Sequence, residues 1–275
     1  MKIFNEIKYA ENMIFQGFIQ KKYEYELKIL AKYYFSKGFC DDILRNKIKE
    51  FCYDHIPDFN EVKYVGMIKR AHKYGENNRL FVVKSVRITQ DEIDKIRTLN
   101  NLKIEKIAFV FLVLANINKQ KYTLYMGDKI KYIQKINKNK KNPLKLPNIS
   151  LPYLLKEKIN NIFTFAKVYL RKKDRNTILR ALIEKEFIIM SDKCGYKINF
   201  IHHNTKNTSL IIENFDDFIL EYERLIGDNI GYCIMCNKPI RITSGRRKYC
   251  NKCSKIVEKE NWVNRKRKQR ENVTK

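Results

Sequence analysis

Four cysteines near the C-terminal end of the chain have the spacing of a metal site. The sequence is YCIMC from 232 to 236 and YCNKC from 249 to 253, so two CxxC pairs stand thirteen residues apart. Two sulfurs of one pair reach a single ion from a tight turn, and thiolates are ligands that zinc prefers. Asn237 tolerates the left-handed backbone that such turns use, and Gly245 marks the tip of the intervening hairpin. The predicted ligands are Cys233, Cys236, Cys250 and Cys253.

Four thiolates leave no open coordination position, so the predicted Zn²⁺ is structural and not catalytic. Binding of such a metal contributes about 10–16 kcal/mol to folding a segment too small to hold a core. An iron–sulfur cluster is the alternative occupant. The segment from 229 onward resembles the zinc ribbons of many nucleic-acid-binding proteins. Zinc ribbons also serve as protein docking modules, and this second use stays open.

The charge of the chain favours a polyanionic partner. Lys and Arg number 57 against 30 Asp and Glu, which gives a net charge of +27. Nucleic acid is the first expectation and an acidic membrane surface the second. Residues 241–275 hold thirteen Lys or Arg and three Glu, although a solvated basic tail would look the same. The predicted contacts in this region are Arg246, Arg247 and Lys248 at the hairpin tip and Arg265 and Arg267 on a helix that starts near Ser254.

A second nucleic-acid-binding element is predicted between 153 and 201. YLLKEKINNIFTFAKVY (153–169) is predicted as one helix or two short ones, and DRNTILRALIEKE (174–186) as a further helix. FIIM and YKINFI form a hairpin around the turn SDKCG. A winged-helix domain has helices followed by a two-stranded hairpin, called the wing. The apolar segment 102–117 would serve as its first helix. Winged helices also form protein interfaces, so this alternative remains.

The helical phase of 174–186 separates a core face from an outer face. The core face holds Ile178, Leu179, Leu182 and Ile183, and Arg175 falls toward it. A major groove admits such a helix, where Asn reads adenine and Arg reads guanine. Glu184 on the outer face is unfavourable near phosphates. The predicted contacts are Lys173, Asn176, Thr177 and Arg180 on the helix and Lys193 at the tip of the wing.

The remaining pattern predicts a mainly α protein with small β parts. Residues 1–85 form a bundle of about four helices, in which Asp41 and Asp42 open one helix and Pro57 stops it. Residues 80–88 form a strand that leads into a capping box from Thr89 to Glu92. The Lys-rich segment 119–152 is an insertion, with a hairpin that turns at Gly127-Asp128 and then a Pro-containing loop. The predicted domains are 1–85, 86–205 with this insertion, a connecting helix in 206–228 (helical from 215 to 227), and the ribbon with its basic tail in 229–275.

The sequence predicts neither catalysis nor a membrane span. GxxxxGK[ST], GxGxxG and GxSxG motifs do not occur, and His202-His203 has no ligand partner at suitable spacing. The longest apolar run, 107–115, is far shorter than the ~20 residues that cross a bilayer. No secretion signal is visible at the start of the chain, and we expect a cytoplasmic, non-enzymatic protein.

The whole chain resembles winged-helix and zinc-ribbon proteins of phages and mobile elements from low-GC Gram-positive bacteria. The resemblance rests on ELKILAKYY, FCYDHIPDFNEVKY, KKDRNTILRALIEKEFI, GYCIMCNKPI and KYCNKCSK. It implies a protein of a bacterial cell or phage-infected host that acts in replication, regulation or defence of an element. Duplex DNA is the favoured partner over RNA. The alternatives are an inhibitor or adaptor that binds a host ribonucleoprotein or defence complex, and an RNA- or ribosome-binding protein.

Overall fold

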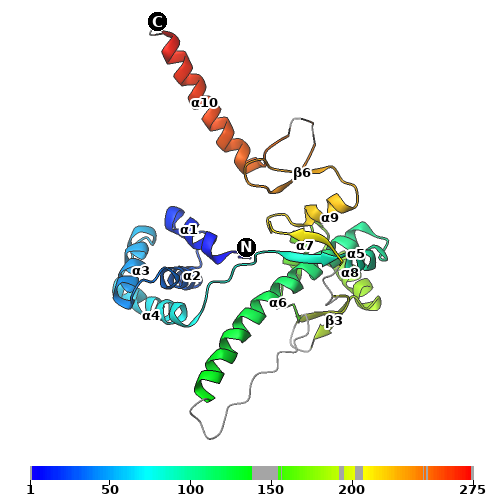
Figure 1. Ribbon diagram of the computed structural model, residues 1–275, viewed down its shortest axis with the longest axis horizontal. Helices are drawn as coiled ribbons and strands as arrows, with labels where there is room; N and C mark the ends of the chain where they lie inside the picture. The colour runs from blue at the N-terminus through cyan, green and yellow to red at the C-terminus, as the bar shows by residue number, and fades with distance from the viewer. Residues whose placement is uncertain are drawn as a thin grey trace. The chain divides into compact units, whose positions relative to one another are not determined.

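The computed structural model describes residues 2–137, 154–155, 157–191, 195–201, 207–243, 245 and 247–273. Within these ranges the chain forms ten helices and seven short strands, so the protein is mainly helical with small antiparallel sheets. It divides into two compact units, Met1–Lys84 and Ser85–Lys275, called here the N-terminal and C-terminal units (Figure 1). None of the helices in the described ranges combines the length and apolar character that crossing a bilayer requires.

Four helices make the N-terminal unit: α1 (Glu6–Gln16), α2 (Tyr23–Ser36), α3 (Asp41–His55) and α4 (Glu61–Asn77). Helix α3 begins at the predicted acidic pair and ends two residues before Pro57. The Asn60 side chain caps α4 by accepting hydrogen bonds from two first-turn amides. A Cβ at Gly75 would lie 2.7 Å from the Cβ of Ala31, so glycine permits the close approach of α4 to α2.

A buried carboxylate ties α1 to α2. Glu26 is fully buried and accepts a hydrogen bond of 2.8 Å from the Tyr9 hydroxyl. It also accepts backbone N–H groups of Ile19 (2.8 Å), Gln20 (3.0 Å) and Lys22 (2.8 Å). The Glu26 carboxylate therefore holds the loop between the two helices in place, because these three loop amides donate to the same carboxylate.

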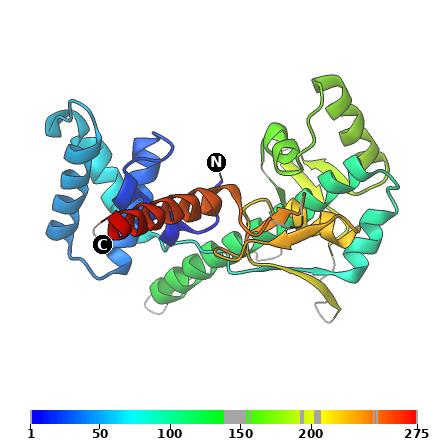
Figure 2. The ribbon, with the colours of Figure 1, turned by 90° about the horizontal axis from the view of Figure 1, so that it is seen from above.

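Helix α6 (Leu102–Asn137) is the centre of the C-terminal unit. Residues 107–115 are buried on every side of the helix, as a helix that is apolar all round requires. Helices α5 (Gln90–Arg97), α7 (Ile159–Phe165), α8 (Lys172–Glu184) and α9 (Ile219–Leu225) surround its first half. The second half of α6 extends away from them (Figures 1 and 2).

The predicted hairpin at Gly127-Asp128 is wrong, because α6 continues as one helix to Asn137. Met126 and Ile133 are buried two helical turns apart, which is the period of a helix. A short alternation suits a hairpin as well as a helix, and the Lys, Gln, Leu and Met of this segment favour continuation of the helix predicted upstream. Residues 138–152 of the predicted insertion lie outside the described residues.

The capping box of Thr89 and Glu92 is confirmed at the start of α5. The strand before it is shorter than predicted: β1 (Val86–Thr89) pairs antiparallel with β5 (Thr208–Ile212). Strand β5 was not predicted, since the sequence pattern placed 206–228 in a connecting helix. Helix α9 occupies only Ile219–Leu225 of that segment and begins four residues later than predicted.

A three-stranded sheet of order β2-β4-β3 stands beside α8. The predicted hairpin forms from β3 (Ile188–Ser191) and β4 (Gly195–Ile198). Strand β2 (Leu154–Leu155) adds to β4, whereas the sequence pattern placed these residues in a helix. The last elements are β6 (Ile230–Tyr232), β7 (Pro239–Arg241) and α10 (Asn251–Val273).

Candidate metal centre and nucleic-acid interface

The four predicted cysteines converge on one point. The Sγ atoms of all four cysteines lie within 4.8 Å of one another. Those of Cys236 and Cys250 are 3.7 Å apart. A tetrahedral ion with metal–sulfur bonds of about 2.3 Å requires sulfurs about 3.8 Å apart. Cys236 is exposed and the other three are buried. The donor set and its size therefore fit a closed tetrahedral metal–thiolate site.

Two local structures bring the pairs together in what we call the Cys module, the described residues between 229 and 273. The first pair follows β6, and its turn closes through a hydrogen bond of 2.9 Å from the Asn237 amide to the Cys233 carbonyl. Asn237 has φ of 51°, the predicted left-handed conformation. The second pair begins just before α10 and places Cys253 in its first turn. A bond of 3.1 Å from the Ile234 amide to the Lys248 carbonyl joins the two arms.

The thiols have different acidities. Burial opposes ionisation of Cys233, but backbone N–H groups of Cys250, Cys236 and Met235 outweigh it and lower the pKa of this thiol to about 6. Burial and hydrogen bonds with the neighbouring thiols raise the pKa of Cys253 to about 12. Four thiolates so close together repel one another, so a divalent cation would supply the charge that ionises the remaining thiols.

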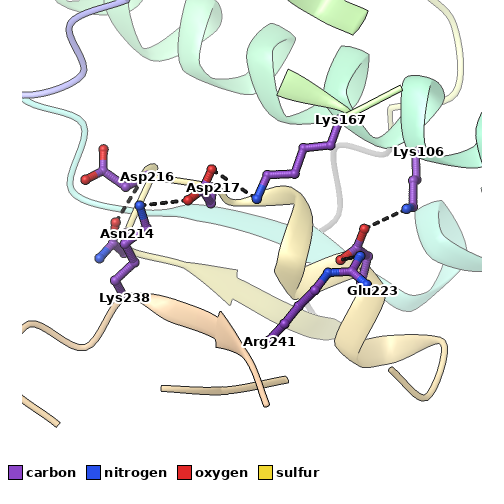
Figure 3. Close-up of polar contacts among 8 residues, drawn as sticks. All are labelled: Lys106, Lys167, Asn214, Asp216, Asp217, Glu223, Lys238 and Arg241. Atoms are coloured by element: carbon purple, nitrogen blue, oxygen red, sulfur yellow. Dashed lines mark hydrogen bonds and ion pairs between the residues drawn. The ribbon is translucent and has the colours of Figure 1, made fainter. Parts of the chain in front are cut away.

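Two carboxylates next to the Cys module fix it to the helices (Figure 3). Glu223 of α9 is fully buried between Lys106 of α6, at 2.6 Å, and Arg241 of β7. Asp217 lies between Lys167, at 3.2 Å, and Lys238, at 2.7 Å (Figure 3). Each carboxylate thus joins one cation of the helical part to one cation of the module.

The electrostatic environment of Asp217 agrees with this bridging role. Burial raises its pKa, but hydrogen bonds and charge from Lys238 and Lys167 more than compensate and hold that pKa below the ordinary value of 3.8. A third carboxylate, Glu221, accepts a bond of 2.8 Å from the Tyr232 hydroxyl. This role of Asp217 was not predicted from the sequence. The available signal was the acid-rich segment FDDFILEYER within a basic chain.

The face of α8 that the sequence assigned to nucleic acid is exposed to solvent. Ile178 and Leu182 are buried on the opposite side. Arg175 is held against the body of the unit, since its guanidinium donates to the Leu170 carbonyl (2.8 Å) and to Asn160 (2.7 Å). The exposed residues of α8 include the predicted contacts Lys173, Asn176, Thr177 and Arg180.

The remaining predicted contacts are spread over the Cys module and beyond it. Lys248, Arg265 and Arg267 are exposed, and Arg247 is half-buried with its guanidinium donating to Asn251 at 2.9 Å. Lys193 and Arg246 lie outside the described residues, as do His202 and His203.

Positive charge is concentrated in the C-terminal unit. Residues 1–84 carry 16 Lys or Arg and 11 Asp or Glu, a net charge of +5. Residues 85–275 carry 41 and 19, a net charge of +22. The four-cysteine cluster, the exposed face of α8 and most of the excess charge therefore belong to the same unit.

Comparison with known proteins finds no family model, no curated protein and no solved structure that matches this chain. The resemblance to proteins of phages and mobile elements stays a prediction.

Proposed function

We propose that the C-terminal unit binds duplex DNA and that the chain is a non-enzymatic DNA-binding protein of a phage or mobile element, acting in regulation or replication. The observation that carries the proposal is the placement of charge: +22 of the +27 lies in the unit that also presents the exposed polar face of α8. Neutralising phosphates releases counterions, so a surface of this kind binds DNA with a strong dependence on salt.

In this proposal α8 is the recognition helix of a winged-helix domain. The order of α6, α7, α8 and the β3–β4 hairpin supports it, as does the burial of Ile178 and Leu182 behind the exposed face. Arg180 would read guanine and Asn176 adenine. Lys173 would contact phosphate.

Zinc is the proposed occupant of the Cys cluster, because four thiolates at tetrahedral spacing are its usual structural site. Its role would be to fold the module and to hold Cys253 at the start of α10. The chemistry of the site is structural, since the four protein ligands fill the coordination shell.

The test is fluorescence anisotropy of labelled duplex DNA, single-stranded DNA and hairpin RNA with the zinc-loaded protein across a salt series. We expect the tightest binding and the steepest salt dependence for duplex DNA. Arg180→Glu should weaken duplex binding about 10- to 100-fold, as a lost base contact predicts. Arg45→Glu, an exposed arginine on a helix of the N-terminal unit, is the matched control and should change it less than 2-fold. Equal effects of the two variants would contradict the proposal.

A second candidate function is an adaptor that binds a protein or ribonucleoprotein through the Cys module. It is favoured by two apolar side chains between the first pair of ligands, Ile234 and Met235, which are 69% and 49% exposed. Weak and equal binding to all three nucleic acids would favour this candidate. Ile234→Ser should then weaken binding to the partner without loss of the metal.

A further inference from the structure

Helix α10 is unusually exposed for its length. It has 23 residues, and from Lys255 to Arg267 every residue is exposed except Val257, which is half-buried. Figure 1 shows it as one uninterrupted helix, and it begins within the second CxxC pair. A helix with polar residues on all sides gains little from packing, so its stability depends on its own pairs or on a partner.

The lysines of α10 are not spread evenly around it. Successive residues are about 100° apart around a helix axis, and this phase places four lysines within an arc of about 60°. Glu258 and Glu260 lie at least about 60° outside the arc by the same phase. All four lysines are exposed, and we call them the lysine stripe: Lys252, Lys255, Lys259 and Lys266.

We propose that α10 lies in the major groove of B-form duplex DNA with the lysine stripe directed at the phosphates. The stripe covers fourteen residue steps, about 21 Å, which matches the rise of about six base pairs. A helix about 10–12 Å across fits a major groove about 12 Å wide. The major groove of A-form RNA is too narrow to admit it. The inference rests on the proposed DNA binding and adds a second contact element to α8.

Trp262 makes this inference directly testable. It is the single tryptophan of the chain, it is 54% exposed, and it flanks the stripe. The Lys266 ammonium lies 4.2 Å from the centre of its ring. DNA in contact with the stripe must change the environment of this ring, whereas DNA bound only at α8 leaves it in solvent.

The experiment titrates the zinc-loaded full chain with duplex DNA and follows two signals together. Anisotropy of labelled DNA reports binding anywhere on the protein, and Trp262 emission reports contact at α10. We expect both signals to change with the same midpoint. A change in anisotropy with constant emission would overturn the inference and leave the proposed function standing. If neither the anisotropy nor the Trp262 emission changes at low salt, both the inference and the proposed function are overturned.

Variants separate the stripe from charge in general. Each lost phosphate contact reduces the slope of log K against log[salt] by about 0.9, equivalent to about 8-fold in affinity at 0.1 M salt. We expect this loss of affinity for Lys255→Gln and for Lys259→Gln. The double variant should lose affinity by the product of the two single factors. The control is Arg45→Gln, which removes one exposed positive charge from helix α3 of the N-terminal unit.

The control variant should keep the wild-type slope within error. Equal slopes for Arg45→Gln and Lys259→Gln would overturn the contact between the lysine stripe and the phosphates. Equal affinity of the protein for duplex RNA and duplex DNA of the same sequence would overturn the placement in the groove.

Discussion

Glu223 is the residue whose removal should most disturb the attachment of the Cys module. Its side chain is fully buried, and its two oxygens accept from Lys106 and Arg241. The Lys106 side chain is 13% exposed, so Glu223→Ala would leave its ammonium buried without a counter-ion. The Arg241 side chain is 49% exposed, and water can solvate its guanidinium once the carboxylate is gone.

Breaking a buried ion pair by removing one partner costs about 3–5 kcal/mol. Because Arg241 can be hydrated, we expect the lower end, about 3 kcal/mol in the free energy of unfolding of the C-terminal unit. Native-state hydrogen exchange of peptides from α6 and α9 measures this free energy separately from the N-terminal unit. The opening equilibrium constant should rise more than 100-fold.

Asp228 provides a matched control, since it also pairs with Arg241, at 3.7 Å, but is 44% exposed. Asp228→Ala should cost at most about 1 kcal/mol, as exposed pairs do. The double variant Lys106→Met with Glu223→Leu should recover most of the loss, because apolar residues often replace a buried pair without cost. An equal cost for Glu223→Ala and Asp228→Ala would refute the role assigned to Glu223.

Three further predictions concern the metal, the pH dependence and the N-terminal unit. Cys236→Ser should lower the zinc content measured by atomic absorption, whereas Cys40→Ser, an exposed thiol outside the cluster, should retain one zinc per chain. The pKa of Asp217 in the folded protein lies below the ordinary value of 3.8. The Asp217 carboxylate therefore stabilises the fold fully above that ordinary value, and this stabilisation is lost as the pH falls through the pKa of the folded state. Asp217→Asn should therefore reduce the loss of stability between pH 4.5 and 3 in urea unfolding, and an unchanged loss would contradict the bridge. Glu26→Ala removes the carboxylate that accepts from four donors, and it should lower the free energy of unfolding of the N-terminal unit by at least about 3 kcal/mol. The exposed control Glu50→Ala should lower it by less than about 0.5 kcal/mol. Hydrogen exchange of α2 measures both free energies.

Features encoded within a few residues were predictable from the sequence. The CxxC spacing determines that two sulfurs of one turn face the same point, and the four sulfurs do converge. The helical period fixes which side of α8 is buried, since positions three and four apart share a face. The capping box of Thr89 and Glu92 is likewise a relation between neighbours.

Features that depend on distant partners were decided only by the tertiary structure. Lys106 and Glu223 stand 117 residues apart, and nothing local marks either as half of a buried pair. Strand β5 exists because β1 pairs with it across the whole of the intervening chain. The alternation around Gly127 suits a hairpin as well as a helix, and the chain forms a helix in which Met126 and Ile133 are buried. The sequence by itself determined which four cysteines converge and which face of α8 is buried, because those depend on local geometry. The attachment of the Cys module to α9 was decided by packing, because burial of a charge depends on which distant groups surround it.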